Sequence, residues 1–296
     1  MISVIITSFK EPKTIGKAIE SFLNQNIKEK YEIIVCAPDE ETLDVAKDYS
    51  KKNKKVKIFK DPGKGKMFAL NLLFKKIKSE FLVLSDGDVF VKENSLIKLL
   101  EVFKDPKVGC VTGRPVSLNS RENLFGYWSH LLCDAGAHGA RLKRQNQGGL
   151  VECSGYYWAF RNNVVKDFPL DVPEDAIIPI YFWQKGYKVV YASEAIVYVK
   201  YPSNLHDFID QKKRTTKAHV QMSKYIDFNK IPKTKTFTNE LLESYRAFLY
   251  PRNFKEMLWT FLLFPVKLYI WCLSLYHVKI SKKYHKDAWK VTKSTK

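Results

Sequence analysis

The sequence has few cysteines and no pattern that would pair them. Five cysteines are an odd number, and no two of them stand at the C-x-x-C spacing of a zinc site or redox motif. Met1 leads within one residue into an apolar run, without the charged and long apolar regions of a secretory signal. We therefore expect no disulfide framework, no structural zinc site and no secretory signal, and we expect a reducing compartment.

Acidic residues are few beside basic ones. The chain has 50 Lys and Arg against 31 Asp and Glu, a formal net charge of +19. Such an excess favours anionic partners: nucleic acid, nucleotide phosphates or an acidic membrane surface. A lysine-rich surface kept for solubility or heat tolerance carries equal weight as an explanation. Helix-turn-helix, zinc-finger and RNP signatures are absent and the cations are spread out, so we expect no nucleic acid partner.

The first 85 residues alternate short apolar runs with amphipathic segments. The 45% apolar content of the 296-residue chain is enough for a real core. The alternation predicts βαβ units and a mostly parallel sheet, whose ligands bind beyond the carboxyl ends of the strands. The expected strands are 3–7, 32–36, 55–59 and 81–85, and the expected helices are 15–23, 40–51 and 67–77.

The carboxyl-end rule points to four loops, residues 8–11, 37–41, 63–66 and 86–88. In the last of them, two carboxylates flank Gly87 and can converge on one Mg²⁺ or Mn²⁺ ion, since both ions prefer oxygen ligands. Taken alone, the Asp-Gly-Asp triplet is more often an ordinary turn.

Two further motifs have a functional and an ordinary reading. The turn 63–66 offers flexible backbone and two lysines to a phosphate, although Met67 stands where a P-loop has Ser or Thr. Its ordinary reading is a basic solvent turn. Glu174 and Asp175 follow Pro173 at an expected helix start. They either complement the helix dipole or form a general base beside a supporting acid.

The second half of the chain has a weaker pattern. We expect helices at 127–144, 173–186 and 206–222 and strands at 151–160 and 189–191.

The tail contains one long apolar segment, residues 257–276, in which Lys267 is the only charge. Twenty helical residues span about 30 Å, enough for a bilayer core. Lys267 would cost about 3 kcal/mol near the bilayer centre, and Pro265 would kink the helix. We therefore expect a helix lying in the membrane interface, ahead of a single span and then of a buried soluble helix. The flanking cations are Arg252, Lys255, Lys279, Lys282 and Lys283.

The motifs follow one another in a recognisable order: an opening loop ending in Glu11, the Gly-Lys turn, the strand before Asp86-Gly87-Asp88, Ser-Gly before an aromatic run, Glu174-Asp175, and Gln211 to Arg214. Over about residues 2–220 the chain resembles glycosyltransferase family 2, inverting enzymes of GT-A fold. The resemblance implies an α/β fold with a Rossmann-like, mostly parallel sheet flanked by helices, and a C-terminal helical tail. We expect a nucleotide-sugar-binding half (1–115), an acceptor-binding and catalytic half (116–225) and a helical, basic, membrane-associating region (226–296).

The resemblance also implies residue roles. Asp175 would be the base, and Glu174 its orienting or acceptor-binding neighbour. Asp86 and Asp88 would hold Mn²⁺ or Mg²⁺, with Asp88 the more direct ligand. The nucleotide-sugar donor would contact Thr7, Phe9, Glu11, Asp39, Lys66, Asp86, Gln211 and Arg214, and the acceptor would contact Ser154, Gly155 and Tyr156.

The chain departs from the family pattern at two places. Ala37-Pro38 replace two acidic residues, one of which reads the base, and Asp39 comes one residue late. Thr215 replaces the tryptophan that accompanies processive polysaccharide synthases, which argues against polymerisation. His206 is the best-placed additional metal ligand, although a histidine on a helix face is more often structural or solvated.

The expected function is that of an inverting glycosyltransferase. It would move a sugar from a nucleotide-diphosphate donor, with UDP-sugar the first expectation, to a lipid-linked or glycan acceptor at the cytoplasmic face of an anionic membrane. One alternative is a nucleotidyltransferase that makes nucleotide sugars, although the loop after the first strand lacks the glycine-rich, Arg-containing sequence of that class. The other alternative is a basic nucleic-acid-binding protein.

Overall fold

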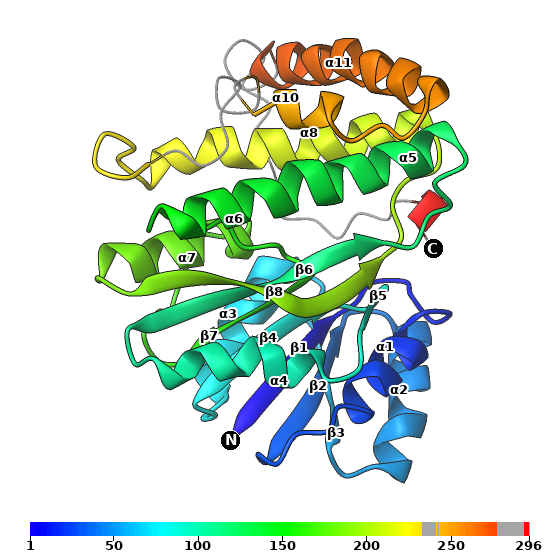
Figure 1. The fold of residues 1–296 in the computed structure, drawn as a ribbon. Helices are drawn as coiled ribbons and strands as arrows, with labels where there is room; N and C mark the ends of the chain where they lie inside the picture. Colours follow the sequence, from blue (N-terminus) through cyan, green and yellow to red (C-terminus); the bar gives the residue numbers. More distant parts are fainter. Residues whose placement is uncertain (233–240, 242, 277–292, 296) are drawn as a thin grey trace.

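One eight-stranded sheet runs through the computed structural model, which describes residues 1–232, 241, 243–276 and 293–295 (Figure 1). The strand order is β3-β2-β1-β4-β7-β6-β8-β5. The first four strands in this order, β3, β2, β1 and β4, are parallel to one another. Strand β7 is antiparallel to both of its neighbours, and β5 is antiparallel to β8. The strands are β1 (Ile2–Thr7), β2 (Tyr31–Ala37), β3 (Val56–Lys60), β4 (Phe81–Asp86), β5 (Val89–Val91), β6 (Val108–Ser117), β7 (Tyr157–Arg161) and β8 (Lys188–Val199).

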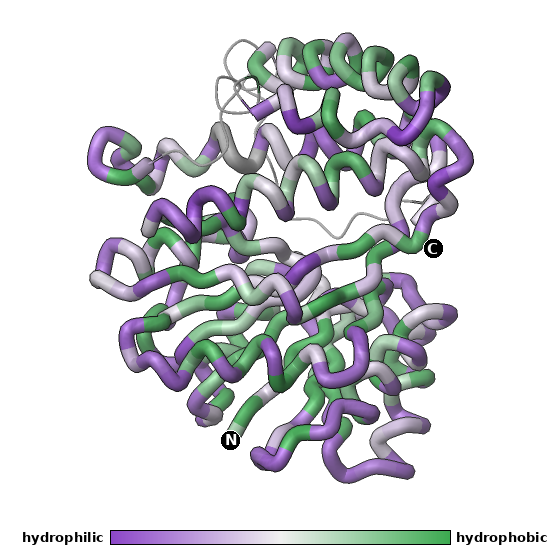
Figure 2. Tube along the Cα trace, viewed as in Figure 1, coloured by the Kyte–Doolittle hydropathy of each residue, from purple (hydrophilic) through white to green (hydrophobic). Residues whose placement is uncertain are grey.

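Helices cover both faces of the sheet, because successive strand residues point to opposite faces and both faces are apolar. One face packs against α3 and α7, and the other packs against α1, α2 and α4. These helices are α1 (Ile15–Leu23), α2 (Glu40–Lys52), α3 (Lys66–Lys76), α4 (Ser95–Leu100) and α7 (Glu174–Gln184). Figure 2 shows the apolar strands at the centre of this sandwich. The predicted α/β fold of GT-A type is confirmed.

A further helical layer lies beyond the sheet, uppermost in Figure 1. It has its own apolar cluster, to which α5, α8 and α11 contribute. The layer contains α5 (Leu124–Leu131), α6 (Gly139–Asn146), α8 (Leu205–Gln221), α10 (Tyr245–Phe248) and α11 (Phe254–Leu275). The 3₁₀- and π-helical segments among the described residues are η1 (Glu101–Lys104), η2 (Leu132–His138), η3 (Met222–Lys224) and η5 (Lys293–Thr295).

Two predicted strands differ from those in the structure. The run 151–160 is a strand only from Tyr157, because the Tyr157 N–H closes a turn on the Ser154 carbonyl before the ladder begins. The run 189–191 is the start of a much longer strand, β8, which pairs first with β6 and then also with β5. The predicted helix 127–144 forms as α5, η2 and α6, and its glycine-containing middle is a π-helical segment.

The expected division into three regions stays a prediction. Strand β6 crosses the boundary at residues 115 and 116 and belongs to the continuous sheet. The long tail helix begins at Phe254 and continues through Pro265 to Leu275. The flanking residues Lys279, Lys282 and Lys283 lie outside the described residues.

Candidate active site

The Asp86-Gly87-Asp88 triplet is tied to the end of β1. Parallel pairing puts Thr7 opposite Asp86, and the Thr7 hydroxyl donates to Asp86 Oδ1 at 2.9 Å. The Gly87 N–H donates to the Thr7 carbonyl at 2.9 Å. A Cβ atom at residue 87 would collide with the Ser8 hydroxyl, so only glycine fits this position. The triplet is therefore held at the sheet edge and is not a free solvent turn.

The opening loop brings Glu11 to the same edge. The Ser8 hydroxyl donates to Glu11 Oε2 at 2.7 Å, and the Glu11 N–H donates to the Thr42 hydroxyl at 2.9 Å. Between them, Lys10 has a φ of 54°, which is uncommon for a residue with a Cβ atom. Phe9 lies half-buried in this loop. A Cβ atom at Gly87 would lie 2.7 Å from Glu11 Oε2, so the Glu11 carboxylate faces the Asp-Gly-Asp triplet.

Asp39 anchors the opening loop to α2. Its carboxylate accepts hydrogen bonds from the Lys10 N–H at 2.8 Å, the Thr42 N–H at 3.0 Å and the Thr42 hydroxyl at 2.7 Å. Partial burial acts to raise the pKa of Asp39, but these hydrogen bonds outweigh it and lower that pKa. Asp39 is thus the N-cap of α2 as well as the candidate reader of the base, and the second role stays a prediction.

Lys66 joins the two acidic motifs, which are 88 residues apart in the sequence. Its Nζ lies 2.9 Å from Asp86 Oδ1 and 2.8 Å from Glu174 Oε1. The Glu174 side chain is only 3% exposed, so this carboxylate is compensated inside the protein. Burial acts to lower the pKa of Lys66, but the charges of Asp86 and Glu174 outweigh it and raise that pKa. Lys66 therefore remains a full cation between two carboxylates.

Asp175 faces the candidate acceptor turn at Gly155. A Cβ atom at Gly155 would lie 3.1 Å from Asp175 Oδ2, so the carboxylate lies directly against this backbone. The turn itself is fixed, because the Ser154 N–H donates to the Thr112 hydroxyl at 3.0 Å. Glu174, the neighbour of Asp175 in the first turn of α7, points instead to Lys66. The two adjacent carboxylates of α7 thus have different surroundings.

Tyr156 lies within electrostatic reach of several predicted site residues. Its carbonyl accepts a hydrogen bond from the Ser85 hydroxyl at 3.0 Å. Burial raises the pKa of the Tyr156 phenol, the charges of Asp88 and Asp86 raise it further, and Arg214 acts in the opposite direction. The charges of both metal-binding candidates and of one α8 cation therefore act on the candidate acceptor turn.

Helix α8 is held against the loop before α7 by Asp171, which sequence reasoning missed. Asp171 accepts hydrogen bonds from Gln221 Nε2 and the Tyr225 hydroxyl, each at 2.5 Å. These partners are 50 and 54 residues away, so no local pattern could have identified them. In the same helix, the Gln211 Oε1 atom is buried and has no hydrogen-bond donor among the described residues.

The carboxylates of Asp86 and Asp88 offer oxygen ligands, which Mg²⁺ and Mn²⁺ prefer. Within the described ranges, no group of three or more His, Cys, Asp or Glu side chains could enclose a metal ion. His206 has an 82% exposed side chain and lies beside Asp207 and Asp210. Asp86 and Asp88 therefore suit an ion whose other ligands are diphosphate oxygens and water, the usual arrangement for Mg²⁺ with phosphate substrates.

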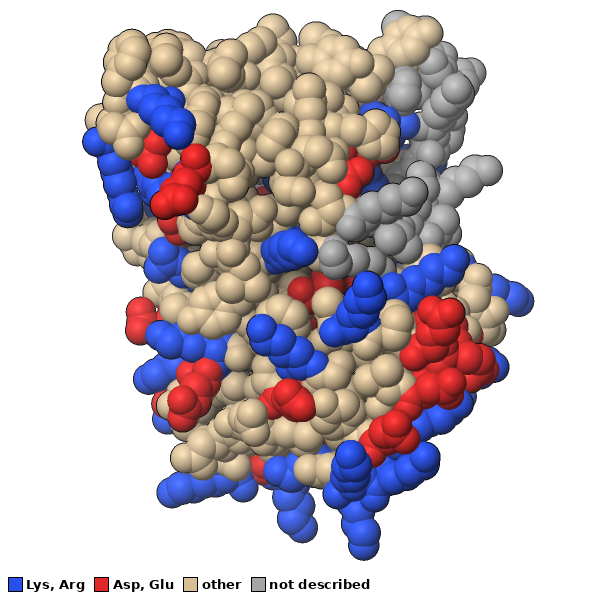
Figure 3. Space-filling view, turned by 90° about the vertical axis from the view of Figure 1, so that its right-hand side faces the viewer, with Lys and Arg blue, Asp and Glu red and all other residues tan. Residues whose placement is uncertain are grey.

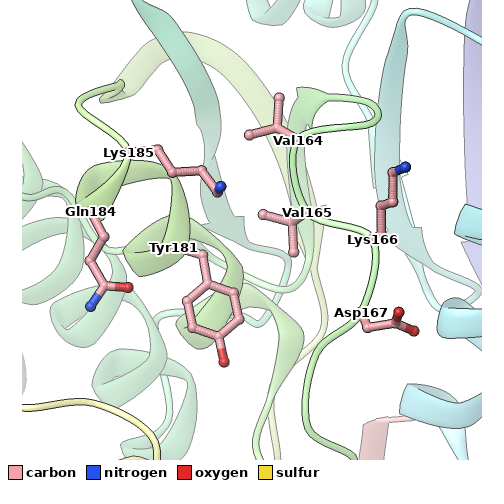
Figure 4. Close-up of a pocket in the computed structure, with 7 residues that line it drawn as sticks. All are labelled: Val164, Val165, Lys166, Asp167, Tyr181, Gln184 and Lys185. Atoms are coloured by element: carbon pink, nitrogen blue, oxygen red, sulfur yellow. The ribbon is translucent and has the colours of Figure 1, made fainter.

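A depression of about 350 Å³ lies at the other end of α7 (Figure 4). Its lining comes from the last turns of α7 and the loop after β7, and includes none of the predicted site residues. The lining residues are Val164, Val165, Lys166, Asp167, Tyr181, Gln184 and Lys185.

Comparison with known proteins gives matches to glycosyltransferases. A family model described as "Glycosyltransferase like family 2" matches residues 1–218. A dolichyl N-acetyl-α-D-glucosaminyl phosphate 3-β-D-2,3-diacetamido-2,3-dideoxy-β-D-glucuronosyltransferase of Methanococcus voltae is 30% identical over 122 residues, 38% of each chain. A poly(ribitol-phosphate) β-glucosyltransferase of Bacillus spizizenii is 26% identical over 130 residues, 40% of this chain and 20% of that protein. The chain thus covers less than half the length of these relatives.

Solved structures share the fold at low sequence identity. The mannosyltransferase PcManGT from Pyrobaculum calidifontis, in complex with GDP-Man and Mn²⁺, superposes with a TM-score of 0.62 at 15% identity, covering 95% of this chain and 81% of that one. S. aureus TarS 1–349 in complex with UDP-GlcNAc gives a TM-score of 0.50 at 16% identity, covering 85% and 73%.

Proposed function

The chain belongs to the glycosyltransferase-like family 2, and from this premise we propose that it transfers a sugar from a nucleotide-diphosphate sugar to an acceptor hydroxyl with inversion. One observation carries the proposal. Lys66 bridges Asp86 at the donor end of the sheet to Glu174, and the next residue, Asp175, faces the acceptor turn at Gly155. The groups needed for the departure of a diphosphate and for the activation of a hydroxyl therefore occupy one site.

Asp175 is the proposed general base. Its carboxylate takes the proton of the acceptor hydroxyl while the acceptor oxygen bonds to the anomeric carbon. The bond from that carbon to the diphosphate oxygen breaks, and the nucleoside diphosphate leaves with the electron pair. A single displacement of this kind inverts the anomeric centre. A positioned base contributes roughly 10²- to 10⁴-fold to such a reaction.

Lys66 and Arg214 are the proposed cations for the leaving diphosphate. Charges fixed beside a developing anion stabilise it more than water does, because they need not reorganise. In this proposal the nucleotide is bound by the other candidate donor residues, which are Thr7, Phe9, Glu11, Asp39, Asp86 and Gln211. Asp86 and Asp88 would hold a Mn²⁺ or Mg²⁺ ion, which would supply Lewis-acid stabilisation to the diphosphate oxygens.

Glu174 acts through Lys66 in this proposal and does not touch the acceptor. The ion pair at 2.8 Å holds the Lys66 ammonium group beside Asp86. It also joins the start of α7, and hence Asp175, to the donor end of the sheet. Ser154, Gly155 and Tyr156 form the acceptor-binding turn.

The donor nucleotide and the acceptor class are finer proposals. We propose a UDP-sugar donor and a lipid-linked or glycan acceptor at the cytoplasmic face of a membrane. The names of the two relatives support an acceptor that contains phosphate, since one acts on a dolichyl-linked sugar phosphate and the other on poly(ribitol-phosphate). The net charge of +19 favours such anionic molecules and surfaces.

A panel of nucleotide sugars tests the proposed function. We expect nucleoside diphosphate release that requires Mn²⁺ or Mg²⁺ and stops with EDTA. Formation of pyrophosphate from a nucleoside triphosphate and a sugar phosphate would instead identify a nucleotidyltransferase. Salt-sensitive binding to bulk DNA without nucleoside diphosphate release would identify a nucleic-acid-binding protein.

A further inference from the structure

The outer face of α11 is apolar and exposed along its whole length. Its large side chains, together with those at the end of α10, are between 36% and 79% exposed. Figure 3 shows a broad uncharged surface at this end of the molecule. We call the following residues the outer face: Phe248, Leu249, Phe254, Leu258, Phe261, Leu262, Leu268, Tyr269, Leu275 and Tyr276.

The opposite face of α11 is fixed to the helices below it. Leu263 and Ile270 are buried in the apolar cluster shared with α5 and α8. Polar contacts add to this packing along the first two turns of the helix. They join Arg121 to Glu256 at 2.7 and 2.8 Å, the Tyr127 hydroxyl to the Thr260 hydroxyl at 2.6 Å, and Trp128 Nε1 to the Trp259 carbonyl at 2.6 Å.

The helical register puts Lys267 on the fixed face. The buried positions of α11 are Glu256, Thr260, Leu263, Ile270 and Ser274, which follow one another at intervals of three, four or seven residues and so share one side of the helix. Lys267 is seven residues from both Thr260 and Ser274, and it is half-buried. The outer face consequently contains no charged residue, and the penalty expected for a lysine in lipid does not apply to it.

We propose that the outer face lies in the interface of an anionic lipid leaflet, with the α11 axis parallel to the membrane. The inference rests on the proposed function, because it supplies the surface on which a lipid-linked acceptor would be met. Amphipathic helices of this kind bury their apolar face about 5–10 Å into the boundary between headgroups and acyl chains. Helix α8, which carries Gln211 and Arg214, packs directly beneath α11.

The charges beside the outer face favour anionic lipid as the occupant. Arg252 and Lys255 are exposed where the helix begins. The one acidic residue from 252 to 276 is Glu256, which is buried in its pair with Arg121. Each cation near an anionic leaflet contributes about 1 kcal/mol to binding.

A spanning orientation conflicts with the contacts of the fixed face. To cross a bilayer, α11 would have to leave α5 and α8 and take the half-buried Lys267 and the buried Glu256 with it. Lys267 lies near the centre of α11, where a charged side chain costs about 2.5–3.5 kcal/mol on insertion scales. The separation would also expose Arg121, whose guanidinium group now pairs with Glu256.

Depth measurement along the exposed side of α11 distinguishes a helix lying in the membrane interface from a spanning helix. Leu258, Pro265 and Cys272 are seven residues apart and all exposed, and the other four cysteines are buried. A fluorophore on Cys272, or on Leu258→Cys or Pro265→Cys with Cys272→Ser, is quenched by lipids labelled at known depths in phosphatidylglycerol-containing vesicles. We expect the same depth at all three positions. A span would separate positions 258 and 272 by about 21 Å.

A matched pair of variants tests the surface itself. We expect Leu258→Glu to weaken vesicle binding at least about 10-fold, since burial of a leucine side chain is worth about 1.5–3 kcal/mol. Leu118→Glu, at a similarly exposed leucine of 47% outside the outer face, should bind like the wild type. Equal binding of both variants, or no vesicle-induced change in the wild type, would overturn the proposal. A second copy of the chain would then be sought as the occupant by sedimentation.

The surface and the proposed function fail in different ways. Vesicle binding is measured without substrate, whereas nucleoside diphosphate release is measured without vesicles. Binding without any donor turnover would contradict the enzyme and leave the surface intact. Turnover without binding would contradict the surface alone.

Discussion

Two regions of the fold, the anchor of α11 and the candidate site, differ in their balance of charge. At the anchor of α11, one guanidinium, Arg121, meets one carboxylate, Glu256, in two hydrogen bonds. At the candidate site, one ammonium, Lys66, lies between two carboxylates, and Asp88 and Asp175 follow closely in the sequence. The balanced pair holds a helix in place. The candidate site has an excess of negative charge, as the proposed binding of a metal ion and transfer of a proton to Asp175 require.

The largest effect is expected from Asp88→Ala, which removes a carboxylate from the candidate site. Turnover should fall to background while the melting temperature stays nearly unchanged, because a loop carboxylate at a sheet edge contributes little packing. EDTA should reproduce the loss with the wild type, and Mn²⁺ or Mg²⁺ should reverse it. Nucleoside diphosphate release measures both. Full activity of Asp88→Ala in the presence of chelator would contradict the metal role.

Asp175→Asn keeps the shape of the side chain and removes the base. We expect kcat to fall at least ~10²-fold with donor affinity nearly unchanged, as for a group used only in the transition state. A residue that only capped α7 would instead cost about 1 kcal/mol of stability and leave kcat intact. Donor titration, thermal melting and turnover on this one variant distinguish the two roles. If kcat survives, the next candidate for the base is Glu174.

Lys66→Met should leave Asp86 and Glu174 without their cation. Loss of one partner of a buried pair costs about 3–5 kcal/mol of stability, and we expect donor affinity to fall about 10- to 100-fold. Lys66→Met combined with Glu174→Gln should recover stability but not donor affinity. If the double variant also recovers donor binding, Lys66 has only a structural role.

Arg121→Met breaks the ion pair with Glu256, and its effect on donor turnover should be smaller than that of Asp175→Asn. We expect a stability loss of about 3–5 kcal/mol, because Glu256 is left buried without the guanidinium group that balances its charge. Turnover with a soluble donor should change less than about 10-fold at temperatures where the variant is folded. A loss of turnover as large as that of Asp175→Asn would show that the two regions are not separable.

The smallest effect is expected in the acid range. The hydrogen bond from Arg121 lowers the pKa of Glu256 to about 2 despite its burial. A carboxyl whose pKa is lower in the folded state stabilises above its unfolded pKa of about 4.3, and that contribution is lost as the pH falls toward 2. The difference in stability between wild type and Glu256→Gln should therefore shrink over this window. A difference independent of pH would contradict the ion pair.

The parallel half of the fold could be read from the sequence, because each strand there is a short apolar run between amphipathic helices. The position of the candidate donor loops followed from the rule that the carboxyl ends of such strands meet at one edge of the sheet. The ion pair between Lys66 and Glu174 could not be foreseen, since it joins residues 108 positions apart. The orientation of Lys267 was hidden for a different reason. Apolar residues lie on every side of the helical projection of residues 257–276, so the sequence does not show which side will meet α5 and α8.

The anomeric configuration of the first product tests the central claim most directly. With water as the acceptor, wild-type protein and an α-linked nucleotide sugar can be followed by proton NMR before mutarotation begins. A single displacement assisted by Asp175 predicts that the β-anomer of the free sugar forms first, together with nucleoside diphosphate. Initial formation of the α-anomer would show that the configuration is retained, and it would contradict the proposed role of Asp175 as the base of an inverting transfer.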